Sequence, residues 1–244
     1  MSNGLTKIRA AIHRGKRLVR TFRGADWWPQ VDRSVRRLRL GDDGAAWTVA
    51  PDYLDRNSVV WSVGVGENIS FDVELHHRFG VQIQAFDPTP RSCCWLQSHG
   101  VPDWFHFHPL GLAGYDGRSR FRAPANTAHV SYAILEDKDH QGDETDIIVE
   151  VRCLATLATA LGQREIDLLK MDIEGAEYGV FDTLPFQGIF PRQLLVEFHH
   201  RHHDRAIAQT IGATHKLQSL GYRLFDVSPN GEEYAFLHAE AEIK

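Results

Sequence analysis

The stretch VVWSVGVGENISFDVELHHRFGVQIQAFDPTP, residues 59–90, decides the fold of this chain. It begins with a short apolar run over 59–63, which is typical of a buried parallel strand. Gly64 and Gly66 follow at once, and glycines allow a tight turn and a close approach of the backbone to a ligand. A helix over 68–79 and a second apolar strand over 81–86 complete the unit. The stretch therefore predicts a strand–turn–helix–strand unit that binds a cofactor.

The second of these strands is followed by Asp87, which lies 21 residues after Gly66 (87 − 66). Folds of this type place a carboxylate here, where it accepts hydrogen bonds from both hydroxyls of a ribose. Nicotinamide dinucleotides and S-adenosylmethionine both contain such a ribose, so the spacing alone fits either cofactor. A glycine turn without any ligand is a third interpretation, which the position of Asp87 makes less favoured.

The glycine turn itself distinguishes between the two cofactors. A pyrophosphate needs exposed backbone N–H groups at the start of the helix, which the third glycine of G-x-G-x-x-G provides. Ile69 takes the place of that glycine, and Glu67 puts a carboxylate at the turn. A negative charge there would repel a pyrophosphate and attract a sulfonium or an α-ammonium group. The turn favours S-adenosylmethionine and leaves a nicotinamide-dependent oxidoreductase as an alternative.

The length of the chain fits one α/β domain with additions, or at most two small domains. The chain has 244 residues, of which 43% are hydrophobic and 24% are charged, as in ordinary globular proteins. It contains no apolar run of about 18 residues and no secretory signal, so we expect neither a membrane span nor secretion. Three cysteines, two of them adjacent, do not form a disulfide framework. These features fit a cytoplasmic protein.

Charge is distributed unevenly along the chain. Residues 1–40 contain eleven Lys and Arg but two acidic residues, a charge of +9, so the other 204 residues carry −14 of the total of −5. An acidic main domain argues against nucleic-acid binding. Apolar residues between Leu5 and Phe22 lie near one face of a basic helix, which could rest on an anionic membrane or a partner protein. We expect instead that this face packs on the acidic domain, because Gly15 weakens the helix.

Strand and helix patterns alternate from residue 58 onward, which predicts a mostly parallel sheet with helices on both faces. The predicted strands are 59–63, 81–86, 104–108, 166–171, 193–198, 222–227 and 233–238; the predicted helices are 68–79, 90–99, 153–161, 175–183 and 203–220. A short Asn-Gly turn joins the last two strands into an antiparallel hairpin.

The domain organisation follows from these patterns. Residues 1–57 form a basic extension and a loop-rich entry segment, and residues 58–244 form the main domain. Residues 114–150 are a polar insertion, a kind of long loop that is usually functional or partly disordered.

Further candidate residues follow a later strand. The run LLKMDIEGAE, residues 168–177, places Asp172 at the carboxyl end of a strand, with Glu174 and Glu177 at the start of a helix. Ligands of open α/β sheets lie outside the carboxyl ends of the strands, so Asp172 would share a crevice with Gly64 if their strands are neighbours. The alternative is that Asp172 caps the helix and the two glutamates stabilise its dipole.

The next strand contains Glu197 near its end and is followed by His199. A histidine at this position suits a general base, because its ordinary pKa lies near neutrality. The histidine-rich run after this strand does not predict a metal site. Adjacent side chains of an extended segment point to opposite sides, and the chain has no cysteine pair or HExxH motif nearby. We therefore predict Asp172, His199 and Glu197 as catalytic candidates and no metal.

Together these segments resemble the FkbM family of S-adenosylmethionine-dependent methyltransferases. The matching pieces cover most of residues 58–238: SVGVGENISFD (62–72), AFDPTP (85–90), LGLAGYDG (110–117), IDLLKMDIEGAEYGVF (166–181) and LLVEFHH (194–200). The resemblance implies an α/β fold with a Rossmann-like seven-stranded class I methyltransferase sheet, helices on both faces and an antiparallel last strand. It also implies O-methylation of a hydroxyl on a small molecule, natural product or glycan.

The resemblance assigns roles to individual residues. Related methyltransferases often carry an acid two residues before the first glycine, where this chain has Ser62, and we expect Glu67 to replace it. Asp172 would face the reacting methyl group, and Asp172, Glu197 or His199 would remove the acceptor's proton. The complete predicted cofactor set is Ser62, Gly64, Gly66, Glu67, Asn68, Phe86, Asp87, Pro88, Leu112 and Asp172. A non-catalytic domain that keeps the fold for binding is the alternative from another class.

Overall fold

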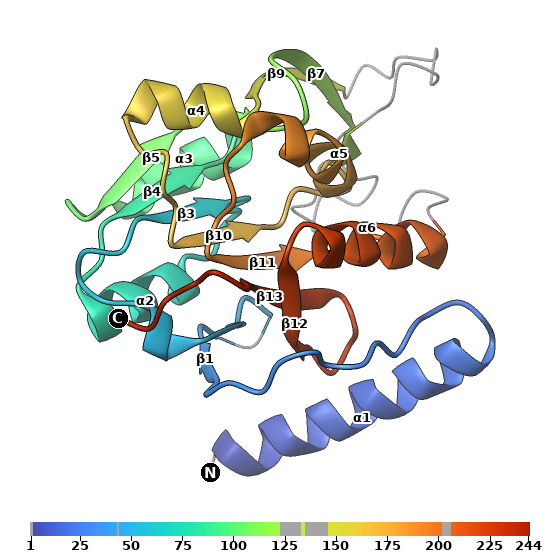
Figure 1. Ribbon diagram of the computed structural model, residues 1–244. Coiled ribbons are helices and arrows are strands. Elements are labelled where there is room, and N and C mark those ends of the chain that lie inside the picture. Colours follow the sequence, from blue (N-terminus) through green and yellow to red (C-terminus); the bar gives the residue numbers. More distant parts are fainter. Residues whose placement is uncertain (1, 43, 123–132, 135–145, 202–205) are drawn as a thin grey trace.

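The computed structural model describes residues 2–42, 44–122, 133–134, 146–201 and 206–244. Its centre is a seven-stranded sheet with the order β12-β13-β11-β10-β3-β4-β5 (Figure 1). Neighbouring strands are parallel except that β13 runs antiparallel to both β11 and β12. The predicted fold class and antiparallel last strand are confirmed. The strands are β3 (Val60–Val63), β4 (Ile83–Phe86), β5 (Phe105–His108), β10 (Leu168–Met171), β11 (Gln193–Glu197), β12 (Tyr222–Val227) and β13 (Glu233–His238).

Helices cover both faces of this sheet, as predicted. One hydrophobic core contains residues of α4, α5 and α6, and a second contains residues of α2 and α3. The predicted helix 203–220 begins at Ile207 among the described residues, and its positions 203–205 lie outside them. The helices are α2 (Ser70–Phe79), α3 (Pro90–His99), α4 (Leu154–Leu161), α5 (Glu177–Gln187) and α6 (Ile207–Ser219).

The two cores follow from the alternation of side chains along each strand. Trp61 of β3 and Leu169 of β10 belong to the core under α4, α5 and α6, whereas Val60 belongs to the core under α2 and α3. Ser62 pairs with Lys170 in the parallel ladder between these strands. By the same alternation, both polar side chains fall on the α2 and α3 side, near the carboxyl end of the sheet.

The entry segment is more regular than the predicted loop. It contributes a two-stranded antiparallel sheet of β1 (Leu38–Leu40) and β2 (Trp47–Val49), followed by the 3₁₀ helix η1 (Pro51–Tyr53). The side chain of Gln193, on β11, accepts a hydrogen bond from Ala50 N at 2.9 Å and donates one to Ala50 O at 3.0 Å. Because this amide is buried, the exchange ties the segment firmly to the central sheet.

A second sheet lies between β5 and α4 in the chain. It has the order β6-β9-β7-β8, with strands β6 (Gly111–Leu112), β7 (Gly117–Arg122), β8 (Ala133–Ile134) and β9 (Ile147–Arg152). The predicted insertion 114–150 therefore contains strands as well as loops. Its residues 123–132 and 135–145 lie outside the described residues.

The long helix α1 (Ser2–Phe22) packs on the domain through its basic face rather than its apolar face. The buried Arg17 donates to Ser228 O at 3.2 Å, and Arg20 donates to Asn230 O at 3.1 Å. Ile12 and Phe22 are exposed. Our expectation that the apolar face packs on the domain is wrong, because the arginines satisfy carbonyl groups of the β12–β13 turn. None of the described helices combines the length and apolar content that crossing a bilayer requires.

Gly64 determines how closely the ends of β3 and β10 approach. Its φ of +76° lies in the left-handed region, and a Cβ atom added there would lie 1.7 Å from the backbone oxygen of Asp172. Gly66 has a φ of +61°, but an added Cβ would meet no atom within 4 Å among the described residues. The first glycine is therefore required by packing within the protein, whereas the second faces open space.

These two glycines lead to a stability prediction. Gly64→Ala should lower the free energy of unfolding by about 3 kcal/mol or more, because the new methyl group collides with backbone atoms that cannot move independently. Gly66→Ala is the matched control and should cost about 1 to 2 kcal/mol, the strain of a left-handed alanine. Urea denaturation monitored by circular dichroism measures both values. Equal losses in the two variants would contradict the packing role of Gly64.

Candidate active site

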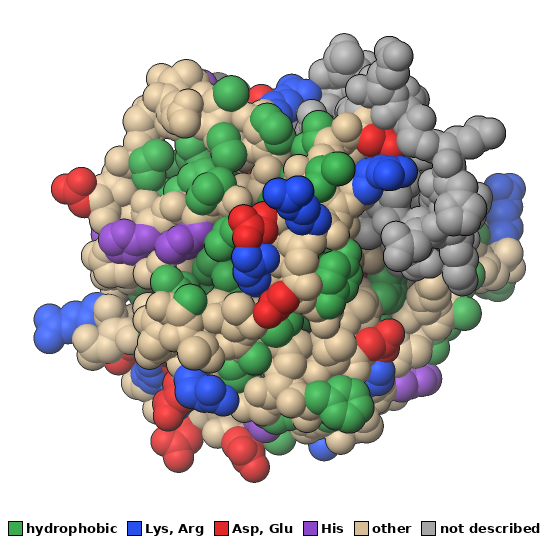
Figure 2. All heavy atoms as spheres, turned by 90° about the horizontal axis from the view of Figure 1, so that it is seen from above, with side chains coloured by type: hydrophobic (Ala, Val, Ile, Leu, Met, Phe, Trp, Pro, Cys, Tyr) green, Lys and Arg blue, Asp and Glu red, His purple; other side chains and the backbone are tan. Residues whose placement is uncertain are grey.

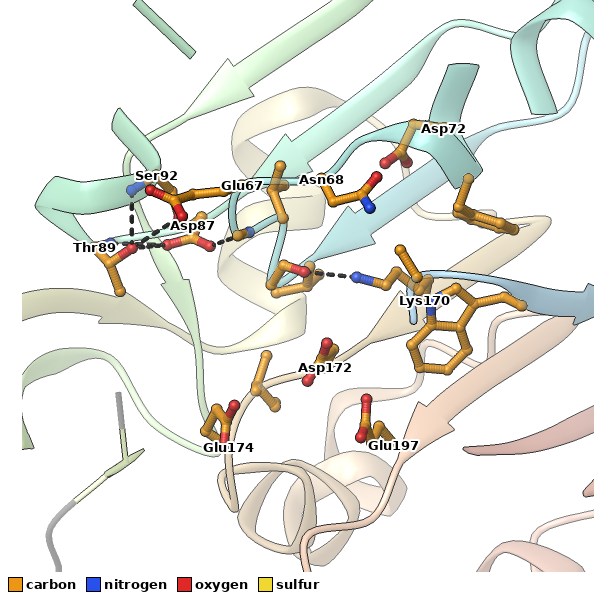
Figure 3. A pocket seen from close by; sticks show the side chains of 18 of the residues that line it. Glu67, Asn68, Asp72, Asp87, Thr89, Ser92, Lys170, Asp172, Glu174 and Glu197 are labelled. Atoms are coloured by element: carbon orange, nitrogen blue, oxygen red, sulfur yellow. Dashed lines mark hydrogen bonds between the residues drawn. The ribbon is translucent and has the colours of Figure 1, made fainter. Parts of the chain in front are cut away.

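A pocket opens at the carboxyl ends of the central parallel strands (Figure 3). Its lining comes from the turns after β3 and β4, the ends of β10 and β11 and the entry segment, with further residues from α2, β6, β7 and β13. Ser62, Phe86 and His199 are not part of the lining. The predicted site residues that do line it are Gly64, Gly66, Glu67, Asn68, Asp87, Pro88, Leu112, Asp172 and Glu197.

Asp87 fixes the shape of two turns in this pocket. Its Oδ2 accepts a hydrogen bond from Gly66 N at 2.9 Å, and its Oδ1 accepts from the backbone and hydroxyl of Thr89 at 2.9 and 2.6 Å. Thr89 in turn caps helix α3 by accepting from Ser92 N. An ionised carboxylate oxygen can accept two hydrogen bonds, so Oδ2 retains capacity for a ligand hydroxyl. Asp87 is thus both a structural anchor and an acceptor at the pocket wall.

The acid that the sequence lacks at Ser62 is present nearby as Asp72. This residue belongs to α2, lines the pocket and is 2% exposed. Burial raises the pKa of Asp72 to about 6, although the charge of Lys170 and the hydroxyl of Ser62 act in the opposite direction. Figure 3 shows the Asp72 carboxylate on the same side of the pocket as Lys170.

Lys170 places a buried ammonium group against the glycine turn. Its Nζ donates to Gly64 O at 2.6 Å and lies 5.3 Å from the centre of the Trp47 ring. A lysine that is 6% exposed needs such partners, because an unpaired buried charge is costly. With Asp72, it gives one region of the pocket both a carboxylate and an ammonium group.

Glu67 does not present the free carboxylate on which its predicted role depends. Arg91 of α3 binds both of its oxygens, through Nε at 2.8 Å and Nη2 at 2.9 Å. Hydrogen bonding to Arg91, together with its charge, lowers the pKa of Glu67 below its usual range. The pair is largely neutral as seen from the pocket, so Asp72 takes over as the candidate acid near the turn.

The predicted adenine-side residues separate into two groups. Leu112 of β6 and Pro88 line the pocket, and their contact with an adenine ring stays a prediction. Phe86 is 1% exposed and packs against Trp61 and His108, with ring centres 5.1 and 4.8 Å apart. Phe86 therefore belongs to the core beneath the pocket and supports the wall without reaching it.

Two further carboxylates, those of Asp172 and Glu197, line the pocket at the ends of neighbouring strands. Asp172 follows β10 and Glu197 ends β11, and these parallel strands pair up to Met171 and Val196. Both side chains line the pocket, and Figure 3 shows them on the same side of it. Burial and the charges of Asp172 and Glu233 raise the pKa of Glu197 well above its usual range. Paired carboxylates of this kind suit proton transfer.

His199 lies behind these carboxylates and is unsuited to the predicted role of general base. It is 4% exposed, with Nδ1 3.3 Å from Glu177 Oε1 and Nε2 3.4 Å from Glu174 Oε2. Burial alone would lower its pKa, but the hydrogen bond to Glu177 and the surrounding carboxylate charges raise it well above the usual value. Both ring nitrogens face carboxylates and the side chain does not line the pocket, so His199 positions its neighbours, including Asp172, whose Oδ1 lies 3.6 Å from Nε2.

The same residues form a donor set for a divalent cation. Asp172, Glu174 and His199 each offer one ligand atom, and these atoms lie within 4.8 Å of one another. Oxygen and imidazole donors suit several divalent metals. Glu174 reaches this cluster from a loop in which its own φ is +52°, an uncommon conformation for a non-glycine residue. The absence of a metal remains a prediction from the sequence.

Sequence reasoning missed Asp72, Lys170 and Trp47. Each stands at a position that also serves an ordinary structural element: a helix, a buried strand and the entry segment. The alternation along β10 offered a signal, because Lys170 interrupts an otherwise apolar strand at a buried position. The sequence pattern of this strand does not reveal the partners of Lys170, since Trp47 lies more than a hundred residues earlier in the chain.

The fold and the pocket define a class of protein. Six strands run in one direction, and the antiparallel last strand is inserted between β11 and β12. This sheet, with a ligand-sized opening at its carboxyl ends, is the architecture of class I methyltransferases. The family model of the methyltransferase FkbM domain matches residues 55–224, which is more than half of the chain. The chain therefore belongs to the FkbM methyltransferase family.

Known proteins resemble the chain in fold and sequence. The crystal structure of methyltransferase FkbM from Methylobacillus flagellatus KT matches with a TM-score of 0.50 and 13% identity, over 76% of this chain and 44% of that one. The human "Probable methyltransferase-like protein 24" is 23% identical over 156 residues, 63% of this chain and 36% of its own length. Its counterpart from Rattus norvegicus is 27% identical over 143 residues, with 57% and 32% covered. The matches span about a third of these curated relatives.

The buried Asp72 leads to a prediction about pH. Its pKa of about 6 in the folded protein exceeds the 3.8 of an unperturbed aspartate, so its contribution to stability is lost as pH rises from about 4 to about 7. Relative to wild type, Asp72→Asn should therefore gain about 3 kcal/mol of unfolding free energy between pH 4 and pH 8. Chemical denaturation of both proteins across this range measures the difference. A difference that does not change with pH would show that Asp72 is not a strained buried acid.

Proposed function

We propose that the protein transfers a methyl group from S-adenosylmethionine to a hydroxyl group of a small molecule, natural product or glycan. The observation that carries this proposal is that a buried carboxylate, Asp72, and a buried ammonium group, Lys170, both line the pocket beside the glycine turn. A buried carboxylate and a buried ammonium group complement the ammonium and carboxylate groups of an amino acid. The methionine part of S-adenosylmethionine has both of these groups.

The other pocket residues fit the rest of this cofactor. Gly66 leaves open space where a side chain would stand, and Oδ2 of Asp87 retains acceptor capacity for a ribose hydroxyl. Leu112 and Pro88 offer an apolar surface for the adenine ring. The nicotinamide alternative gains no support, because the N–H group of Gly66 already donates to Asp87 rather than being free for a phosphate.

Little chemistry is required of the protein in this reaction. S-adenosylmethionine, when bound, supplies a methyl group on a sulfonium sulfur. The acceptor oxygen forms a bond to this carbon as the carbon–sulfur bond breaks, and the hydroxyl proton passes to a carboxylate of the protein. Glu197 would accept this proton, and Asp172, held by His199, would orient the hydroxyl group. Both assignments follow from the carboxylates that line the pocket.

The acceptor would enter on the side of the entry segment. Trp47 of β2, Phe121 of β7 and Glu233 of β13 also line the pocket. An aromatic surface beside carboxylates suits a ring that bears hydroxyl groups, as in sugars and many natural products.

The first test is cofactor binding, measured by titration calorimetry with S-adenosylhomocysteine. Wild type should bind, and Lys170→Met should weaken binding about 10- to 100-fold, the effect of losing a charge-assisted hydrogen bond. Lys216→Met is the matched control, because this lysine pairs with Asp182 on the surface, away from the pocket. Binding of NAD in place of S-adenosylhomocysteine, or equal affinity in the Lys170 variant, would refute the cofactor assignment.

The second test is turnover, followed as release of S-adenosylhomocysteine with a panel of hydroxyl-bearing acceptors. Glu197→Gln and Asp172→Asn should each lower kcat about 100-fold while cofactor affinity changes little, because proton transfer contributes about this factor. Asp182→Asn is the exposed control.

Parallel reactions with Mg²⁺ and with EDTA show whether the cluster of Asp172, Glu174 and His199 acts through a metal. Unchanged kcat in both variants would contradict the catalytic assignment. Cofactor binding without turnover on any acceptor would favour the non-catalytic alternative.

A further inference from the structure

The face by which α1 packs on the domain is fixed by buried charges. Asp26, four residues after the end of α1 at Phe22, is 5% exposed and is within ion-pair distance of Arg17 at 3.7 Å and Arg20 at 3.2 Å. Arg201, after β11, also binds this carboxylate and reaches Asn230 O at 2.6 Å. Arg17 packs so closely on Gly231 that a Cβ atom added to this glycine would lie 2.5 Å from the Arg17 Nε atom. These bonds determine which side of α1 faces inward.

The opposite side of α1 is an apolar stripe that faces outward. Positions three, four and seven apart lie on one face of a helix, and the exposed large apolar side chains of α1 follow this spacing. Phe22 is 86% exposed and Ile8 is 60% exposed. Small residues, Ala11 and Gly15, fill the stripe between them. The members of the apolar stripe with large side chains are Ile8, Ile12, Leu18, Val19 and Phe22.

Cationic side chains border the apolar stripe, and α1 contains no acidic residue. Arg9, Lys16 and Arg23 fall along one edge of the stripe and Arg14 along the other, and all four are exposed. Arg14, Lys16 and Arg23 form no ion pair with any residue that the structure describes. Figure 1 shows α1 along the outside of the molecule, with one side turned away from the domain. On the opposite face of the protein, Figure 2 shows charges of both signs mixed with scattered apolar side chains.

We propose that α1 is a peripheral membrane-binding helix that lies in the surface of an anionic lipid bilayer. An apolar stripe bordered by Lys and Arg is the pattern by which helices insert their apolar face at the boundary between headgroups and acyl chains. The charge argues against a second copy of the chain, because two α1 helices in contact would bring their cations together. The acidic domain would face away from the negatively charged lipid.

This binding does not depend on methyl transfer, but it would orient the candidate active site. Arg17 and Arg20 hold the turn between β12 and β13, and Ser228 of that turn accepts from Arg17 through its backbone oxygen. The Ser228 hydroxyl is hydrogen-bonded to Glu233, which lines the pocket. The helix and the pocket wall are therefore parts of one connected structure, and a membrane-bound α1 holds the pocket at a fixed orientation to the lipid surface.

The test is sedimentation of the full chain with vesicles. Wild type should bind vesicles of phosphatidylcholine with about 30% phosphatidylserine, bind pure phosphatidylcholine weakly, and be released by salt. Ile12→Glu/Phe22→Glu should lower the affinity at least tenfold, because two inserted apolar side chains become charged. Arg14→Gln/Lys16→Gln/Arg23→Gln should lower it about fivefold for each charge removed and weaken its salt dependence.

Phe186→Glu is the matched control, because this phenylalanine is 88% exposed on α5, outside the apolar stripe and the pocket. It should bind vesicles as wild type does, and all variants should keep the wild-type circular dichroism spectrum. Failure of wild type to bind anionic vesicles, or equal loss in the Phe186 variant, would overturn the proposal. It would also be overturned by concentration-dependent dimers in size-exclusion chromatography that Ile12→Glu/Phe22→Glu abolishes, since the stripe would then bind a second copy.

Discussion

The candidate active site depends on the close approach of Gly64 to the backbone oxygen of Asp172, from which a Cβ atom added at Gly64 would lie only 1.7 Å. A side chain at position 64 would overlap this oxygen, so the turn after β3 and the loop after β10 can approach only with a glycine between them. The parallel pairing of the two strands then brings the glycine turn and the carboxylate of Asp172 to one edge of the sheet. The position of β3 next to β10 therefore determines the site, because moving either strand would separate the glycine turn from Asp172.

Charge burial is the cost of this arrangement. Asp72 and Lys170 lie on the side of the sheet that is otherwise filled by apolar residues of α2, β1 and β2. Replacing such a pair by apolar side chains commonly leaves a protein as stable or more stable, so packing alone does not account for their presence. A ligand with an ammonium and a carboxylate group would give each of these buried charges a partner of opposite sign. Their presence is therefore better explained by ligand binding than by a contribution to the stability of the fold.

The sequence predicts features that depend on local spacing and fails where distant residues meet. The seven strands follow from apolar runs of strand length, and Asp87 follows from its distance to the glycine turn. The roles of Glu67 and His199 do not, since each depends on partners in another element: Arg91 pairs with the first, and the carboxylates of Asp172, Glu174 and Glu177 surround the second. Residue type suggested a free acid and a base, and the tertiary environment supplied charged partners that occupy both side chains.

The N-terminal helix shows why hydrophobic pattern alone can give the wrong orientation. An amphipathic helix usually turns its apolar face to the core, because removing that surface from water is favourable. Here three arginines converge on the buried Asp26, and buried charges without partners would be more costly than an exposed apolar stripe. The carbonyl groups of the β12–β13 turn add acceptors that an apolar face could not satisfy. The electrostatic requirement of one carboxylate thus decides which face of a 21-residue helix meets the solvent.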